Sequence, residues 1–102
     1  EDNNVVAIKG DEEARLLNES LDLAEKRAKY PERVRYLAEI GIGTNSKAKL
    51  IGATIVDEKV FGTAHVAIGS NYWFGGKNKT IVHYDQVFKS PRIRIDGEVL
   101  RF

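Results

Sequence analysis

Apolar positions along this chain form one helical stretch, followed by several short runs typical of strands. Four apolar residues recur at the spacing of one helical face: Leu17, Leu21, Ala24 and Ala28. Acidic residues begin this stretch and basic residues end it, which complements the helix dipole. We therefore predict a helix over residues 11–29, with Asp11 as its N-cap and Pro31 beyond its end.

Strands are predicted from short apolar runs and from alternation of apolar and polar residues. These runs cover residues 5–8, 34–42, 63–68, 80–89, 92–95 and 98–102. Gly41 and Gly43 are expected to break the second run, and residues 57–61 to form one helical turn. Asp96-Gly97 between the last two runs predicts a hairpin. We expect an α+β fold: one long N-terminal helix and a mixed or antiparallel β-rich core that ends in the hairpin.

Composition narrows the classes of function. The 102 residues suit a single domain, residues 1–102, with 16 basic and 15 acidic side chains. This balance argues against nucleic acid or an anionic membrane as the main partner. Cysteine is absent, which excludes disulfides, thiolate metal sites and a cysteine nucleophile. The chain starts with Glu1 rather than Met and lacks a signal-peptide pattern, so we expect a piece of a larger cytoplasmic protein.

Four side chains in the predicted strands suit a metal ion: Glu39, His65, His83 and Asp85. His83 and Asp85 are two residues apart, so a strand points both to one side. Glu39 lies in an apolar run, where an ionised carboxylate needs a cation to offset its burial. Two imidazoles and two carboxylates without a thiolate form a plausible site for a divalent cation.

Each of these residues also has a purely structural interpretation. Glu39 could form a salt bridge with Arg33, Arg35 or Lys49. His65 could be a hydrogen-bonded core histidine, and the His83–Asp85 pair could lie exposed on an edge strand. The aromatic cluster 72–74 could stack a ligand, but a core plug or an interface anchor is the commoner role of such residues.

Four segments occur in a characteristic order: AEIGIGTN at 38–45, DEKVFGTAHVAIG at 57–69, GGKNK at 75–79 and HYD at 83–85. In order and spacing, residues 38–97 resemble the thermophilic dimetal aminopeptidase family, typified by aminopeptidases T and S. The resemblance implies an exopeptidase that removes N-terminal residues from peptides with two divalent metal ions, zinc, cobalt or manganese.

The resemblance also implies a role for each matching residue. Glu39, His65, His83 and Asp85 match the metal ligands of the family, and Tyr72 matches the tyrosine that assists at the scissile carbonyl. The family's upstream glutamates and large N-terminal domain have no counterpart here. The chain thus resembles the C-terminal metal-bearing portion alone, which we expect to be inactive by itself. Peptide substrates, the missing N-terminal domain and a second copy in a homodimer are the implied partners.

Two alternatives to the aminopeptidase stay open at this point. Members of the same superfamily resemble ring-cleaving dioxygenases, whose single ferrous ion could be held by His65, His83 and Asp85. The chain could also be a non-catalytic interaction or dimerisation module that packs the aromatic patch 72–74 on a partner.

Overall fold

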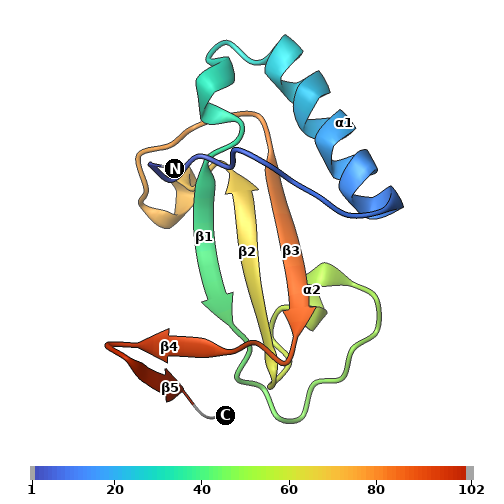
Figure 1. Ribbon diagram of the computed structural model, residues 1–102, viewed down its shortest axis with the longest axis vertical. Helices are drawn as coiled ribbons and strands as arrows, with labels where there is room; N and C mark the ends of the chain where they lie inside the picture. Colours follow the sequence, from blue (N-terminus) through green and yellow to red (C-terminus); the bar gives the residue numbers. More distant parts are fainter. Residues whose placement is uncertain (1, 101–102) are drawn as a thin grey trace. The chain divides into compact units, whose positions relative to one another are not determined.

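A computed structural model describes residues 2–100 of the chain, with one long helix, a sheet and a terminal hairpin (Figure 1). The elements are, in order, α1 (Glu12–Arg27), the 3-10 turn η1 (Pro31–Arg33), β1 (Leu37–Ile42), α2 (Thr54–Asp57), β2 (Thr63–Gly69), the 3-10 turn η2 (Tyr72–Phe74), β3 (His83–Lys89), β4 (Ile93–Ile95) and β5 (Glu98–Leu100). The predicted α+β fold is confirmed. Within the described residues, no helix is both long and apolar enough to cross a membrane.

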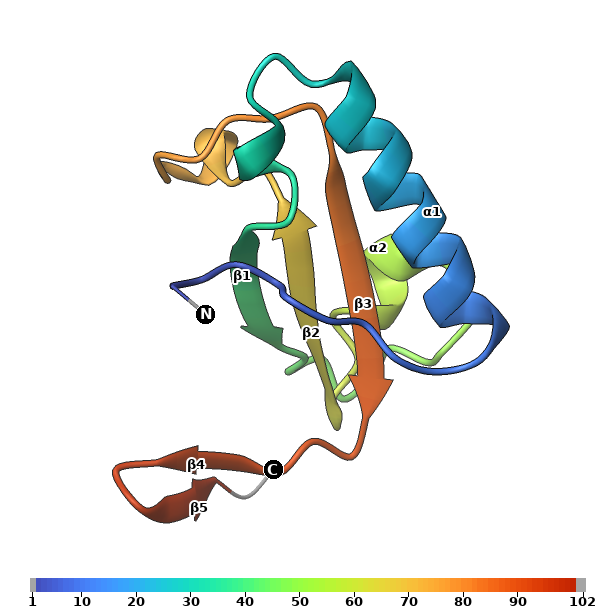
Figure 2. The same ribbon diagram turned by 45° about the horizontal axis from the view of Figure 1, so that its top comes forward.

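The three long strands form one sheet in the order β1-β2-β3. Neighbouring strands run in opposite directions, as the arrows in Figures 1 and 2 show. Contacts divide the chain into two compact units: Glu1–Glu39 with Ala67–Tyr84, and Ile40–Val66 with Asp85–Phe102. Each of the three strands contributes residues to both units.

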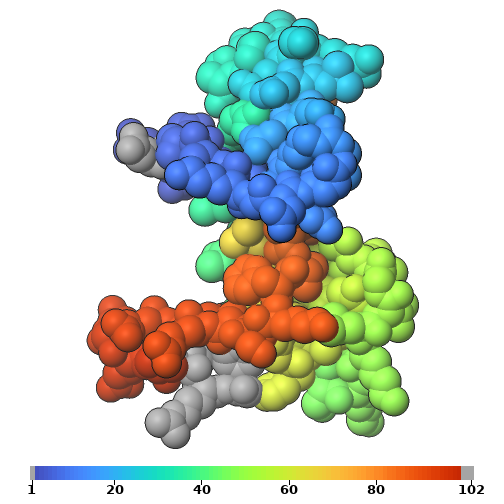
Figure 3. Space-filling view, turned by 45° about the vertical axis from the view of Figure 1, so that its right-hand side comes forward, coloured from blue at the N-terminus to red at the C-terminus, as the bar shows by residue number. Residues whose placement is uncertain are grey.

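The first unit has its core beneath helix α1. Four apolar side chains form the buried cluster: Leu21, Ala24, Val34 and Ile68. Leu17 and Ala28 pack against this cluster, so the predicted helical stripe is confirmed. The opposite face of α1 is exposed to solvent (Figure 3). The helix is shorter at its C-terminal end than predicted, because Ala28 already has extended backbone and η1 follows.

The predicted strand at 5–8 is wrong. Val5 and Ile8 do pack against the core, but the backbone of this segment forms an isolated bridge between Asn4 and Tyr36 rather than a strand. These two apolar side chains are partly buried although the segment does not form a strand. Similarly, Val34 is fully buried next to η1, and β1 begins only at Leu37.

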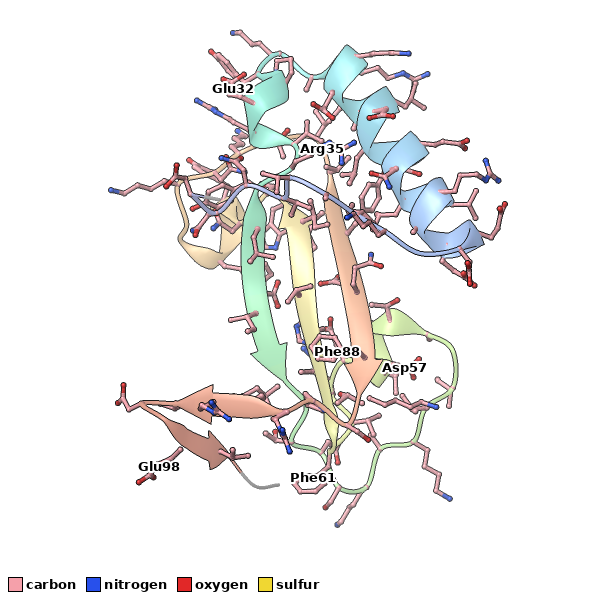
Figure 4. The ribbon with its side chains drawn as sticks, in the orientation of Figure 1. Glu32, Arg35, Asp57, Phe61, Phe88 and Glu98 are labelled. Atoms are coloured by element: carbon pink, nitrogen blue, oxygen red, sulfur yellow. The ribbon has the colours of Figure 1, made fainter. Side chains whose placement is uncertain are left out.

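Arg35 attaches the segment before β1 to helix α1 in the first unit (Figure 4). Its guanidinium donates hydrogen bonds of 2.7 Å each to Asp22 and Glu25. Arg35 is thus paired with two carboxylates of the helix, Asp22 and Glu25.

In the second unit, the predicted helical turn is displaced towards the N-terminus. It forms at Thr54–Asp57 rather than at 57–61. The Asp57 carboxylate accepts hydrogen bonds from the backbone N–H groups of Ile51 (2.8 Å) and Gly52 (3.1 Å), and so holds the preceding loop against the turn. The residues that follow Asp57 lead directly into β2.

Strand β2 confirms the prediction over 63–68, whereas β3 begins at His83, later than predicted. The hairpin is confirmed by antiparallel pairing of Ile93 with Leu100 and of Ile95 with Glu98. Its turn places Asp96 at φ 50° and Gly97 at φ 85°, the left-handed conformation that this dipeptide favours. Residues 101–102 of the predicted last strand lie outside the described residues.

Candidate metal site

In the first unit, Glu39 of β1 and His83 of β3 face one another. The distance from Nε2 of His83 to Oε2 of Glu39 is 3.4 Å, and the side chains are 15% and 25% exposed. The other ring nitrogen, Nδ1, lies 2.7 Å from the carbonyl oxygen of Ser70. Because a carbonyl oxygen only accepts, Nδ1 carries the hydrogen of this bond. In the neutral imidazole, the lone pair of Nε2 therefore points towards the Glu39 carboxylate.

This arrangement suits a histidine that binds a metal ion. Ligand histidines typically donate their second N–H to a backbone carbonyl or carboxylate, which fixes the tautomer and the orientation of the ring. A lone pair and a carboxylate at 3.4 Å repel one another unless a positive charge lies between them, either a proton or a metal ion. The pair can thus supply one nitrogen and one oxygen ligand.

The carbonyl that orients His83 belongs to a well-connected loop. The Ser70 hydroxyl donates to the Asn78 carbonyl (3.1 Å), and the Asn78 amide side chain donates to the Gly69 carbonyl (2.7 Å). The backbone N–H of Asn78 in turn donates to the side-chain oxygen of Asn71 (3.0 Å). These bonds fix the backbone on which the Ser70 carbonyl lies, so the orientation of the imidazole is built into the fold.

Trp73 and Phe74 pack their rings against the same imidazole, with centroid distances of 5.1 and 5.7 Å. Both aromatic residues are 61% exposed, so the interpretation as a core plug is wrong. Tyr72 is also exposed, and the Lys79 ammonium lies 5.0 Å from the centroid of its ring. Trp73 and Phe74 therefore flank a candidate ligand and leave large apolar surfaces open to solvent.

In the second unit, a second group of ligand atoms forms around His65. Glu58, His65 and Asp85 each offer one nitrogen or oxygen atom within 4.8 Å of the others. The His65 side chain is only 5% exposed and that of Glu58 is 14% exposed, with 4.0 Å between Nε2 of His65 and Oε2 of Glu58. Lys59 pairs with the other oxygen of Glu58 at 2.8 Å. One imidazole and two carboxylates suit a divalent cation of the zinc, cobalt or manganese type.

Gly41 provides the space that the His65 ring occupies. A Cβ on Gly41 would lie closer than 3.0 Å to three atoms of this ring. A Cβ on Gly43 would instead collide with the carbonyl group of Val60. The prediction that these glycines break the strand is wrong for Gly41, since β1 continues through it to Ile42. Glycine is needed at position 41 because the His65 ring lies close against the backbone there.

Glu58 is a candidate ligand that was not predicted. It directly follows Asp57 in the sequence. The sequence alone does not show which of these two adjacent carboxylates faces the strand histidine. In the structure the Asp57 carboxylate binds loop N–H groups, whereas Glu58 faces His65. The sequence feature that could have indicated Glu58 is its position seven residues before His65, which lies in a predicted strand.

All four predicted ligands are therefore found in His–carboxylate groups. Glu39 lies with His83 in the first unit, and His65 lies with Asp85 and Glu58 in the second. His83 and Asp85 are two residues apart on β3, so the alternation of the strand directs both side chains to the same side of it. Tyr72 belongs to η2, in the first unit.

Comparison with known proteins identifies no relative: no family model, no curated protein and no solved structure matches this chain.

Proposed function

We propose that this chain is the metal-bearing portion of a metal-dependent aminopeptidase, which removes N-terminal residues from peptides. The observation that carries the proposal is the orientation of His83. Its Nδ1–H is held by the Ser70 carbonyl, while Nε2 faces the carboxylate of Glu39. Metal-ligating histidines typically donate such a hydrogen bond to a backbone carbonyl, and the Glu39 carboxylate lies beside the nitrogen that would bind the ion.

The two His–carboxylate groups would each hold one divalent ion. In such enzymes the ions polarise the peptide carbonyl and lower the pKa of a bound water towards neutrality. Tyr72 would donate a hydrogen bond from its phenol to the carbonyl oxygen of the substrate as negative charge develops there. Its exposure leaves the hydroxyl accessible to a peptide. The proposal also includes the cytoplasmic location, the missing N-terminal domain and the homodimer that the family resemblance implies.

The extra carboxylate of Glu58 favours this proposal over the ferrous dioxygenase. A dioxygenase site uses two histidines and a single carboxylate around one ion. Here His65 is accompanied by two carboxylates, Glu58 and Asp85, while His83 has Glu39. A ligand set rich in carboxylates suits hydrolytic metal ions.

Calorimetric titration of the chain with zinc, cobalt and manganese tests the proposal. We expect heat from metal binding in the wild type and its loss in the double variant His83→Ala/Asp85→Ala. The matched control is Gln86→Ala/Asp96→Ala, which changes one residue of the same strand and one turn aspartate, and should bind like the wild type. Equal metal affinity in the wild type and the His83/Asp85 variant would refute the site, and no heat at all would support the interaction module.

Activity measurements separate the two enzymes. The chain alone should not hydrolyse aminoacyl anilides at an appreciable rate, because the upstream glutamates of the family lie outside it. Rapid hydrolysis by the 102-residue chain would contradict this expectation. Oxygen uptake on aromatic diols after anaerobic loading with ferrous iron would instead establish the dioxygenase.

A further inference from the structure

A cavity of about 320 Å³ lies in the first unit, and none of its lining residues belongs to a His–carboxylate group. Three basic side chains line it, Lys29, Arg33 and Lys79, together with the apolar groups of Ala28, Tyr30 and Ile81. Its lining residues come from the segment after α1 and from the chain that leads into β3, and the ribbons of Figures 1 and 2 show where these two segments run. We call it the basic cavity.

The basic cavity has no acidic residue in its lining. Within residues 2–100, no carboxylate forms an ion pair with Lys29, Arg33 or Lys79, whereas Arg15 and Arg35 each bind two carboxylates. Three positive charges gathered without a counter-charge repel one another. An anion in the cavity would remove this repulsion, so the site is suited to negative charge although the net charge of the chain is only +1.

Aromatic rings hold the cations in position. The guanidinium carbon of Arg33 lies 4.1 Å from the ring centroid of Tyr30, and the Lys29 ammonium lies 5.4 Å from the same centroid. Lys79 is held over Tyr72 at 5.0 Å. Such cation–π contacts restrict the cationic side chains before a ligand binds. The entropy lost when these side chains become ordered on binding is therefore smaller.

The two walls of the cavity are joined by Asn78. Its side-chain amide donates to the carbonyl oxygen of Arg33 (3.0 Å) and to that of Gly69 (2.7 Å). Lys79 follows directly in the chain and is thereby kept beside Arg33. The negative end of the α1 dipole also lies near the cavity, but its charge of about half a unit is smaller than the three full charges of the cations.

We propose that the basic cavity binds a small organic anion with an apolar body, such as an aryl or alkyl carboxylate or phosphate. The planar guanidinium of Arg33 can bind either group through two hydrogen bonds, and the lysines add charge. Ala28, Tyr30 and Ile81 would contact the apolar body. This site does not depend on the proposed aminopeptidase activity.

Nuclear magnetic resonance titration with phenyl phosphate and with phenylacetate tests the proposal, and benzyl alcohol serves as the neutral analogue. The anions should shift the resonances of Tyr30 and Ile81, and the neutral analogue should not. Tighter binding of one anion would assign the site to phosphates or to carboxylates. Arg33→Gln and Lys79→Gln should each raise the dissociation constant about tenfold, since a charge-assisted hydrogen bond contributes ~1.5 kcal/mol or more.

Arg27→Gln and Lys77→Gln are matched controls, because each removes one positive charge from a neighbouring position that does not line the cavity. They should leave the dissociation constants within about twofold of the wild type, apart from long-range charge effects that salt screens. The proposal is overturned if the controls weaken binding as much as Arg33→Gln does. Shifts of equal size with benzyl alcohol, or no shifts with either anion, would also overturn it.

Discussion

Gly41→Ala tests whether β1 is shaped around the imidazole of His65. The new Cβ would lie 2.9 Å from Nδ1 and closer still to two other ring atoms, whereas ordinary van der Waals contact begins at 3.4 Å. The ring must therefore move by roughly 1 Å or turn out of its buried position. Gly41 does not have a positive φ, so the backbone itself tolerates alanine and the collision is the main effect.

The expected magnitude follows from the burial of His65. Inserting a methyl group into a well-packed site typically costs about 1–3 kcal/mol of unfolding free energy. In the proposed metal site, a displaced ring would also leave Glu58 and Asp85 without a nitrogen co-ligand, and disturbing the orientation of a ligand histidine typically lowers metal affinity by about 10–100-fold. Gly41→Ala should thus reduce both stability and metal affinity.

A double-mutant cycle measured by urea unfolding separates the collision from other effects. In a His65→Ala background the ring is absent, and Gly41→Ala should then change the unfolding free energy by less than about 0.5 kcal/mol. If Gly41→Ala destabilises both backgrounds equally, the contact with His65 is not the cause, and the proposed reason for this glycine is refuted.

Two further predictions concern local structure. Asp57→Ala removes the acceptor of the Ile51 and Gly52 N–H groups and should lower the unfolding free energy by about 2 kcal/mol in urea titration, while Asp57→Asn, which keeps one oxygen, should lose less. The hydrogen bond from Arg15 lowers the pKa of Glu12 below its usual value of 4.5. The ionised carboxylate therefore stabilises α1 above that pH, and this contribution is lost as the pH falls through the lowered pKa. Circular dichroism should show a steeper acid loss of helix in the wild type than in Glu12→Gln, and identical curves would contradict the pairing.

Elements with a strong local pattern could be predicted from the sequence. The stripe that includes Leu21 and Ala24 identified α1, and Asp96-Gly97 identified the hairpin because few dipeptides adopt its left-handed turn. The strand predicted at 5–8 is wrong because an apolar run is typical of a strand and equally of an irregular segment that packs against the core. Burial alone does not show whether the backbone has a partner strand.

The candidate site could be predicted only in part. Glu39 and His83 were named for their chemistry, but their approach depends on a sheet in which β2 separates their strands. No local pattern encodes that order. The role of Glu58 was hidden because the helical turn ends earlier than its sequence indicates, which gives adjacent carboxylates different partners.

Long-range ¹H–¹⁵N spectra of the imidazole rings, recorded during zinc titration, test the central claim most directly. We predict that Nδ1 of His83 keeps its hydrogen towards Ser70 throughout, while the Nε2 resonance moves to the position of a metal-bound nitrogen. The account is contradicted if zinc leaves both nitrogens of His83 unchanged, or if the metal binds Nδ1 instead.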